Sequence, residues 1–481
     1  MLKENVKIAI IGGGVAGATT AIQLGQLGMN VTLFEKESSL VSGPPFCHLH
    51  AGGNLYREIS DKQCITLLKQ SIDFLRFYPY VVDYRPTVIA LPTTDKSTPK
   101  ALLPRLDLLV EEYEKLIQEN NKNKVLGESD NYYKLYEKAD LEALQENDYV
   151  RVPKSSDDWM IPVAKNIDLN KVQFPLILVQ EYGLNLFRLA AGTMLTLKEL
   201  PNVTLRMNTM VREIYKKENI WNIFSIKNEY EKSNEDFDYI INAAGFRVGK
   251  IDDMVNAPCK RMVEFKAAYV SKCTNFADTL FPEIIFHGER GTPQGMGQFT
   301  PYPNGYVQLH GMTTDITLYK DGLVSNTAVS CQPKLGEDFI KKIERSWSTE
   351  ETYQRTSSAI KHLSQFIPAF AQAIVGSKPL FGAQQIPGDD PTLRVAEVSF
   401  PTEQYARCEI VKVSSVIDMI STIIKKFIKL NYLNSSVSNK KVFEYLEEVS
   451  EKDLQIYAET LALQRDYPSS LANRNITKKN N

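Results

Sequence analysis

The chain has 481 residues, 43% of them hydrophobic and 24% charged, which is typical of a globular protein large enough for two or three hydrophobic cores. Its formal net charge of −2 provides no positive field, so the composition excludes nucleic-acid binding as the main function. The scattered cysteines form no CxxC pairs, and no signal-peptide pattern or long apolar stretch is present, so we expect a cytoplasmic protein without disulfides, metal site or membrane span.

A glycine-rich turn follows the first predicted strand, residues 7–11. Gly12, Gly14 and Gly17 fit the GxGxxG pattern, in which the first glycine permits a tight turn and the second lets the backbone approach a pyrophosphate. The third lets the following helix pack closely on the strand, and the N–H groups at the start of that helix attract phosphates. The spacing predicts a dinucleotide site and disfavours the alternative of an ordinary strand–helix–strand unit.

Glu35 ends the second predicted strand, residues 31–34, about 20 residues after the glycines. Its carboxylate can accept hydrogen bonds from both ribose hydroxyls of an adenosine, and it disfavours a 2′-phosphate. FAD or NAD is therefore expected as the cofactor rather than NADP. We assign the neighbouring Lys36 to the same cofactor site.

A long loop rich in small residues covers positions 42–54, and loops of this kind usually carry function. Apolar residues at helical spacing predict a helix over residues 61–77, and a strand over 86–91 is expected to begin a second domain. Residues 100–148 have a charged helical pattern with a solvated turn at 119–124. This pattern predicts a solvated helical insertion.

The middle of the chain is expected to return to the cofactor site. A long helix is predicted over residues 174–199, and strands follow between 203 and 226. A buried strand over 238–242 then runs into Ala244 and Gly245, where small residues let the backbone pass close to the cofactor. Distant segments are therefore predicted to build one site.

The last part of the chain is predicted to form a sheet followed by helices. Period-two alternation predicts an antiparallel sheet over residues 260–335, and helices follow over 336–374. A loop over 381–392 and a strand over 393–400 precede a helix over 409–430. The apolar stripe of this last helix, with lysines beside it, fits either a membrane surface or packing on the first sheet, and packing is favoured.

From about residue 6 to residue 430, these motifs and their order resemble the D-amino-acid-oxidase-like group of FAD-dependent oxidoreductases. The resemblance implies that the cofactor is FAD and that the glycine turn holds its pyrophosphate. It also implies a place for each further segment, with Glu35 at the adenosine ribose, the backbone of Val211 at the adenine, Ala51, Gly52 and Gly53 along the isoalloxazine, and Gly382 in a C-terminal glycine loop.

One segment departs from the pattern of this group. Such enzymes often have a Gly-His-Gly turn before the last helix, whose N-terminus stabilises negative charge on the flavin. In this chain, residues 404–409 occupy the corresponding position and contain no Gly-His-Gly turn. Arg407 is the candidate for the positive charge that would stabilise the flavin there. Residues 182–188 also distantly resemble malate:quinone oxidoreductase, a short match that implies no substrate.

Three histidines are candidate general bases, because an imidazole titrates near neutral pH. His48 and His50 lie in the loop expected to contact the flavin, and His310 lies in the predicted sheet. A structural role is the alternative for each of them. Covalent attachment of the flavin to a loop histidine or to Cys47 is a further alternative.

Three arginines are candidate anchors for a substrate carboxylate, which a guanidinium binds through two parallel hydrogen bonds. They are Arg57, Arg261 and Arg394, and Arg394 is preferred because it directly follows the C-terminal glycine loop. A surface position or a stabilising ion pair is the alternative for each.

The predicted fold is α/β, with a Rossmann-like three-layer FAD-binding domain and an α+β substrate domain built on an antiparallel sheet. We expect the FAD domain from residues 1–90, 170–259 and 375–430, the substrate domain from 91–169 and 260–374, and a helical or polar tail over 431–481. The predicted reaction transfers a hydride from an amino acid, amine or 2-hydroxy acid to FAD, with reoxidation by oxygen or a quinone. A flavin monooxygenase or halogenase and a non-catalytic FAD-binding factor are the alternatives, and peripheral contact with the inner face of a membrane is not favoured.

Overall fold

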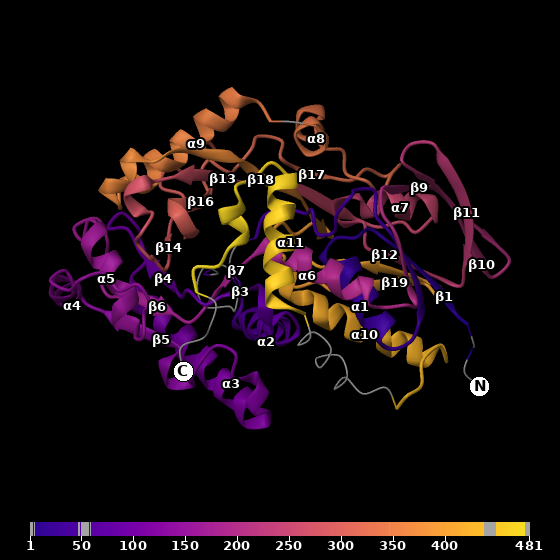
Figure 1. Ribbon diagram of the computed structural model, residues 1–481, viewed down its shortest axis with the longest axis horizontal. Coiled ribbons are helices and arrows are strands. Elements are labelled where there is room, and N and C mark those ends of the chain that lie inside the picture. Colours follow the sequence, from indigo (N-terminus) through magenta and orange to yellow (C-terminus); the bar gives the residue numbers. More distant parts are fainter. Residues whose placement is uncertain are drawn as a thin grey trace.

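The computed structural model describes residues 3, 5–46, 49, 57, 59–345, 347–436 and 449–476. Two large sheets organise the chain, and in Figure 1 the first lies towards the right of the view and the second towards the left and top. The helices labelled α1, α6 and α10 gather under the first sheet, whereas α9 lies along the second.

The first sheet has six strands in the order β19–β20–β12–β1–β2–β8, and neighbouring strands are parallel except for β19 and β20. In chain order its strands are β1 Lys7–Ile11, β2 Asn30–Phe34, β8 Val203–Arg206, β12 Tyr239–Asn242, β19 Val398–Thr402 and β20 Tyr405–Cys408. The central strands β1 and β12 are almost wholly buried, which explains their continuous apolar sequence.

Two further layers cover this sheet. On one face lie the helices α1 Val15–Gln26, α6 Leu186–Lys198 and α10 Val416–Lys429. On the other face lie a three-stranded antiparallel sheet and a short helix, namely β9 Thr209–Lys217, β10 Ile220–Lys227, β11 Glu231–Phe237 and α7 Val248–Met254. This arrangement confirms the predicted three-layer Rossmann-like domain.

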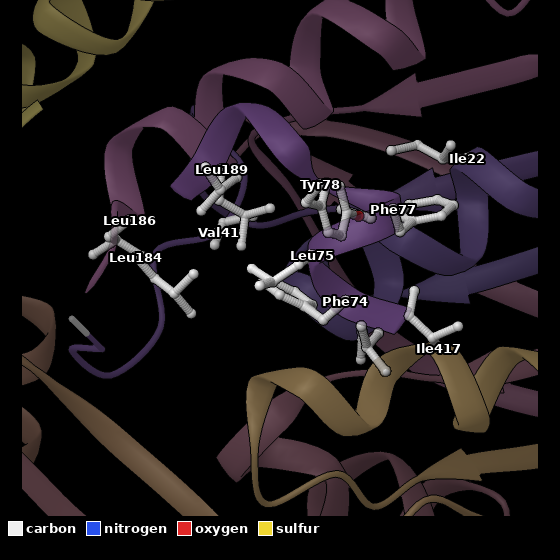
Figure 2. Close-up of a cluster of buried hydrophobic side chains, with 14 of the residues drawn as sticks. Ile22, Val41, Phe74, Leu75, Phe77, Tyr78, Leu184, Leu186, Leu189 and Ile417 are labelled. Carbon is white, nitrogen blue, oxygen red and sulfur yellow. The ribbon is translucent and has the colours of Figure 1, made fainter. Parts of the chain in front are cut away.

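The helical layer contains the largest hydrophobic core. Figure 2 shows Ile22 of α1, Phe74 and Tyr78 at the end of α2 (Asp61–Phe77), Leu189 of α6 and Ile417 of α10 packed together. The apolar stripe of α10 lies within this core, which confirms the prediction that it packs inside the protein. Among the residues with described structure, no helix is long and apolar enough to cross a membrane.

The second sheet has nine strands. Eight of them follow the order β17–β13–β16–β15–β14–β4–β6–β5, and β18 pairs with β13. Their bounds in chain order are β4 Thr87–Ala90, β5 Tyr133–Tyr136, β6 Leu176–Val179, β13 Arg261–Lys272, β14 Glu283–Phe286, β15 Gly297–Pro301, β16 Tyr306–Gly311, β17 Leu323–Ser325 and β18 Ile374–Pro387. All pairings are antiparallel as predicted except that β4 and β14 are parallel.

The remaining helices lie around this sheet, and α9 contacts β13, β15, β16 and β18. Their bounds are α3 Leu103–Glu119, α4 Lys138–Leu144, α5 Ser156–Asn166, α8 Glu337–Glu344 and α9 Thr349–Ser364. A two-stranded sheet, β3 Val82–Asp83 with β7 Gly183–Leu184, adjoins the start of α6.

Three sequence-based expectations about elements are wrong. The helix predicted over residues 174–199 begins only at α6, because the apolar run 176–179 pairs with β4 and β5, and Asn185 caps α6 by accepting a hydrogen bond from the N–H of Arg188. The predicted insertion over 100–148 contains strand β5 between its helices. The loop predicted over 381–392 is strand β18 as far as Pro387, because its backbone pairs with β13.

Three strands of the second sheet come from segments predicted to belong mainly to the FAD domain. β4, β6 and β18 pair within this sheet, although the sequence assigned their residues mainly to the FAD domain. The predicted limits at residues 90, 170 and 375 therefore do not coincide with the limits of the sheets.

The described C-terminal segment, residues 449–476, packs on the helical layer. Its helix α11 Glu451–Gln464 contacts α6. Arg465 then donates hydrogen bonds to the carbonyl oxygens of Leu40 and Val41, at 2.6 and 3.1 Å. The segment therefore fixes the loop that follows β2.

Candidate active site

The turn between β1 and α1 depends on two glycines. Gly12 has a φ of +104°, and a Cβ built on it would lie 2.5 Å from the carbonyl oxygen of Ala243. A Cβ on Gly17 would lie 1.8 Å from the carbonyl oxygen of Gly12. Only glycine therefore allows β1, α1 and the end of β12 to approach one another this closely.

Gly14 and Gly245 have open space in front of them instead. A Cβ on either residue would meet no atom within 4 Å, and both residues line the same cavity. Gly14 is the N-cap of α1 and carries no side chain to bond the first turn, so the N–H groups and positive dipole end of α1 can receive an anion. The open space at Gly14, which a Cβ would fill, fits the pyrophosphate of a dinucleotide.

Glu35 lies at the edge of the glycine turn between β1 and α1. Its Oε2 accepts a hydrogen bond from the N–H of Gly13 at 2.6 Å, and its Oε1 accepts one from the N–H of Glu37 at 2.8 Å. Burial raises the pKa of Glu35, and the two backbone donors oppose this rise. The ammonium of Lys36 lies 2.5 Å from a carboxylate oxygen of Glu37, so the pair presents little net charge beside Glu35.

A cavity of about 380 Å³ lies between the glycine turn and the second sheet. Its wall on the side of the first sheet includes Gly14, Val15, Ala16, Val41, Gly43, Pro44, Pro45, Phe46, Ala243, Gly245 and Cys408, together with residues 410–413 before α10. Its opposite wall comes from β13, β15, β16 and β18. Ligand sites commonly lie at such an interface between two cores.

The wall from the second sheet carries a charged triad. Glu264 and Lys266 are two residues apart on β13 and therefore face the same side of the strand. The Nζ of Lys266 lies 2.5 Å from Oε2 of Glu264, and Nη2 of Arg290 lies 2.6 Å from Oε1. Burial alone would raise the pKa of Glu264, but the two cations outweigh it and lower the pKa to about 2.

We expect this triad to stabilise the protein in a pH-dependent way. The pKa of Glu264 in the folded protein lies below its usual value of 4.5, so its contribution is present above about pH 4.5 and is lost as the pH falls towards 2. The wild type should lose up to about 3 kcal/mol of unfolding free energy relative to Glu264→Gln across that window. Denaturant unfolding at several pH values measures this difference, and a constant difference from about pH 6 to pH 3.5 would contradict the ion-pair geometry.

His310 and Arg394, two of the predicted catalytic residues, line the same cavity. His310 lies on β16, with its Nδ1 3.3 Å from Oγ1 of Thr317. Arg394 lies between β18 and β19, and its Nη1 donates to the carbonyl oxygens of Pro391 and Leu393 at 3.0 and 2.9 Å. The structure therefore brings an imidazole and a guanidinium to the wall opposite the glycine turn.

Several predicted site residues lie outside the described part of the chain. They are Cys47, His48, His50, Ala51, Gly52 and Gly53. Val211, predicted to contact the adenine, lies on β9 near Glu35, because the N–H of Thr209 on the same strand donates to the carbonyl oxygen of Glu35 at 2.8 Å.

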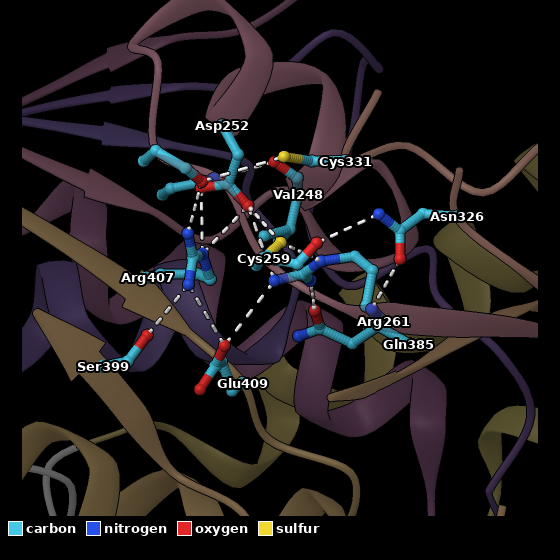
Figure 3. Close-up of polar contacts among 12 residues, drawn as sticks. Val248, Asp252, Cys259, Arg261, Asn326, Cys331, Gln385, Ser399, Arg407 and Glu409 are labelled. Atoms are coloured by element: carbon cyan, nitrogen blue, oxygen red, sulfur yellow. Dashed lines mark hydrogen bonds and ion pairs between the residues drawn. The ribbon is translucent and has the colours of Figure 1, made fainter. Parts of the chain in front are cut away.

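Arg407 lies in a buried ion-pair cluster instead of lining the cavity (Figure 3). Its Nε lies 2.9 Å from both carboxylate oxygens of Asp252, and its Nη2 donates to the carbonyl oxygen of Ala257 at 2.7 Å. The structure therefore does not place Arg407 where it was predicted to supply positive charge to a flavin. Lys412, which precedes α10, lines the cavity instead.

Two of the three candidate carboxylate anchors are also held in ion pairs. Arg261 belongs to the cluster of Figure 3, with Nη2 3.4 Å from Asp252 and Nη1 donating to Gln385 at 2.8 Å. Arg57 binds Asp95 through two parallel hydrogen bonds of 2.9 Å. These pairs correspond to the structural alternative considered for each residue.

Gly382 lies within β18 next to the cavity wall. A Cβ on Gly382 would lie 2.6 Å from the backbone nitrogen of Pro44, which itself lines the cavity. This glycine therefore lets β18 pack directly against the loop after β2. Gly382 itself does not line the cavity, whereas the next three residues of β18 do.

Sequence reasoning missed the charged triad, although one signal for it was present. In the predicted sheet Val263 and Phe265 alternate with Glu264 and Lys266, so two opposite charges fall on one face of an otherwise buried strand. Charges on a buried strand are expensive unless they are paired or face a ligand. That pattern indicates a polar site on this face of β13.

The comparisons with known proteins show the family to which the chain belongs. A family model described as FAD dependent oxidoreductase matches residues 7–392. A search of curated protein sequences found no match.

Solved structures show the same fold at low sequence identity. L-amino acid deaminase from Proteus vulgaris is 11% identical, with a TM-score of 0.57, and the match covers 92% of this chain and 97% of that one. Glycerol-3-phosphate dehydrogenase from Bacillus halodurans, complexed with FAD, is 12% identical, with a TM-score of 0.57 and coverage of 98% and 74%. L-proline dehydrogenase from P. horikoshii is 14% identical, with a TM-score of 0.54 and coverage of 88% and 94%.

Proposed function

This chain belongs to the FAD-dependent oxidoreductase family, and from this premise we propose that it oxidises an amino acid, an amine or a 2-hydroxy acid and passes the electrons to oxygen or a quinone. The observation that carries the proposal is the cavity, which has a glycine turn on one wall and an imidazole and guanidinium on the other. The solved structures with this fold include enzymes named for amino acids and for glycerol 3-phosphate, which supports a small polar substrate.

The residues of the first sheet would hold the cofactor. The backbone at Gly14 and the first N–H groups of α1 would bind the pyrophosphate, and Glu35 would accept hydrogen bonds from the ribose. The backbone at Ala244 and Gly245 would pass beside the cofactor, because Gly245 faces the cavity without a side chain. FAD, when bound, supplies the acceptor for the hydride that leaves the substrate carbon.

His310 of the second sheet and Arg394, which follows the last strand of that sheet, would deprotonate and bind the substrate. The guanidinium of Arg394 would hold a carboxylate through two parallel hydrogen bonds, which fixes the position of the adjacent carbon. The imidazole of His310 would accept the proton that leaves the substrate N–H or O–H group. The hydrogen-bond partner Thr317 would orient this imidazole through Nδ1.

An anaerobic reduction panel tests this proposal. We expect at least one amino acid, amine or 2-hydroxy acid to remove the visible flavin absorbance of the purified protein in the absence of oxygen, and NADH and NADPH to leave it unchanged. Readmitting oxygen, or adding a soluble quinone, then identifies the acceptor that restores the absorbance.

Two results would contradict the proposal. Reduction by NADH or NADPH alone would favour a monooxygenase or halogenase. A colourless protein that also fails to bind added FAD would contradict the assignment of FAD as its cofactor.

A further inference from the structure

The positive charge on the second-sheet wall exceeds what a simple amino acid or hydroxy acid needs. We call the residues Glu264, Lys266, Arg290 and Arg394 the cationic wall, since all four line the cavity. It contains three cationic side chains and one carboxylate. Lys412 lines the cavity from the opposite side, in the segment before α10, and is not part of this wall.

Glu264 is fully engaged by its two cationic neighbours. Each of its carboxylate oxygens receives one cation, Lys266 at 2.5 Å and Arg290 at 2.6 Å. The side chains of Glu264 and Lys266 are only 12% and 19% exposed, so little water competes with this pair. Glu264 is therefore poorly placed to bind a substrate ammonium, and it neutralises only one of its two neighbours.

Arg290 keeps hydrogen-bonding capacity on the cavity side. Its Nη2 binds Glu264, but its Nη1 lies 3.3 Å from the thioether sulfur of Met312, which is a weak acceptor. An anionic oxygen would bind this N–H group more strongly than sulfur does. Arg290 can therefore bind Glu264 and a ligand at the same time.

Arg394 provides a second cation, and the described residues place no carboxylate within ion-pair distance of it. Among the described residues its hydrogen bonds go only to the backbone carbonyl oxygens of Pro391 and Leu393, and it forms no ion pair there. Burial lowers the pKa of Lys266, with a small further contribution from the positive charge of Arg394, and both residues line the cavity. A single substrate carboxylate would pair with only one of the two guanidinium groups, Arg290 or Arg394, and leave the other without an anionic ligand.

We propose that the substrate carries two acidic groups, one bound by Arg394 and the other by Arg290 beside the Glu264–Lys266 pair. The proposal rests on the function proposed above and narrows its substrate to a dianion, such as an amino or hydroxy dicarboxylic acid or a phosphate ester. An ion pair with each cation removes the cost of leaving a positive charge in a partly buried cavity. A compound with a single acidic group would pair with only one of the two arginines.

Binding of inert anions to the FAD-loaded protein tests the proposal independently of turnover. Acetate, succinate and inorganic phosphate are titrated at constant ionic strength, and Kd is read from the change in the visible flavin spectrum and from the midpoint of thermal unfolding. Bound FAD keeps the probes out of the pyrophosphate site. We expect succinate or phosphate to bind at least about tenfold more tightly than acetate, and their order distinguishes a dicarboxylate from a phosphate ester.

Variants show whether the cationic wall causes this preference. Arg290→Gln and Lys266→Met should each bring the dianion-to-acetate ratio to within about threefold, whereas Arg151→Gln, at an exposed site away from the cavity, should keep it. Equal affinities for all three anions in the wild type, or a preference that survives both wall variants, would overturn the proposal. If dianions bind tightly but no oxidisable compound reduces the flavin, the proposed reaction fails while the dianion site stands.

Discussion

The Gly14→Ala variant is expected to fold as the wild type does but to purify without bound FAD. A Cβ at this position meets no protein atom within 4 Å, and the backbone angles of Gly14, φ −64° and ψ −177°, are open to any L-amino acid. The methyl group would instead occupy the space in which the pyrophosphate approaches the backbone. We expect FAD affinity to fall by about 100-fold or more, measured by titrating FAD into the apoprotein.

Another N-cap glycine provides a matched control. Gly336 is the N-cap of α8 and also lacks a side-chain cap, and a Cβ there would make an ordinary 3.6 Å contact with Phe339. Gly336→Ala therefore makes the same change at a helix start outside the cavity and should keep the flavin. By contrast, Gly17→Ala should fail to fold, because its Cβ would overlap the carbonyl oxygen of Gly12. A Gly14→Ala protein with the FAD content of the wild type would refute the assignment of this turn.

Removing the carboxylate of Asp252 is expected to be the most destabilising single change in the ion-pair cluster of Figure 3. Asp252 is fully buried and accepts hydrogen bonds from Arg407 and, at 2.7 Å, from the hydroxyl of Tyr405. Asp252→Ala leaves the buried guanidinium groups of Arg407 and Arg261 with only the more distant carboxylate of Glu409, at 3.6 and 3.5 Å, as a shared counterion. We expect a loss of about 3–5 kcal/mol, measured by denaturant unfolding.

An exposed ion pair serves as the comparison for this change. Lys227 and Glu231 lie 3.6 Å apart with about half of each side chain exposed, at 48% and 49%. Glu231→Gln should therefore cost less than about 1 kcal/mol. Similar losses in the two variants would mean that the Asp252 cluster contributes no more than a surface pair does.

The same cluster connects stability with the shape of the cavity. Arg261 binds the side chain of Gln385, which in turn donates to the carbonyl oxygen of Cys408 at 2.9 Å. Gln385 and Cys408 both line the cavity. Loss of Asp252 is therefore expected to disturb a wall of the site as well as the buried contacts between the two sheets.

Short-range patterns predicted the cofactor half of the site. The glycine turn, α1 and Glu35 lie within one strand–helix–strand unit, so spacing along the chain determines how they meet in space. The family match and the six-stranded sheet confirm the fold class and the cofactor inferred from that unit.

The substrate half of the site depends on pairing between distant strands, which spacing does not reveal. The glycines near residue 382 suggested a loop, yet β18 is a strand because β13, more than a hundred residues earlier, pairs with it. Arg407 looked like a flavin ligand because of its place before the last helix. The nearer of its two acidic partners, Asp252, lies 155 positions away and could not be identified from local sequence.

The hydrogen bonds from Arg465 to the loop after β2 affect the order in which parts of the cofactor site can form during synthesis. Arg465 and Val41, a residue of the cavity wall, are 424 positions apart. At typical rates of synthesis, roughly 20–85 s pass between the appearance of these two residues on the ribosome. During that interval the first strand–helix–strand unit can form, but the loop beside it lacks its last support. We therefore expect stable binding of FAD only after translation has passed Arg465 and α11 has packed on α6.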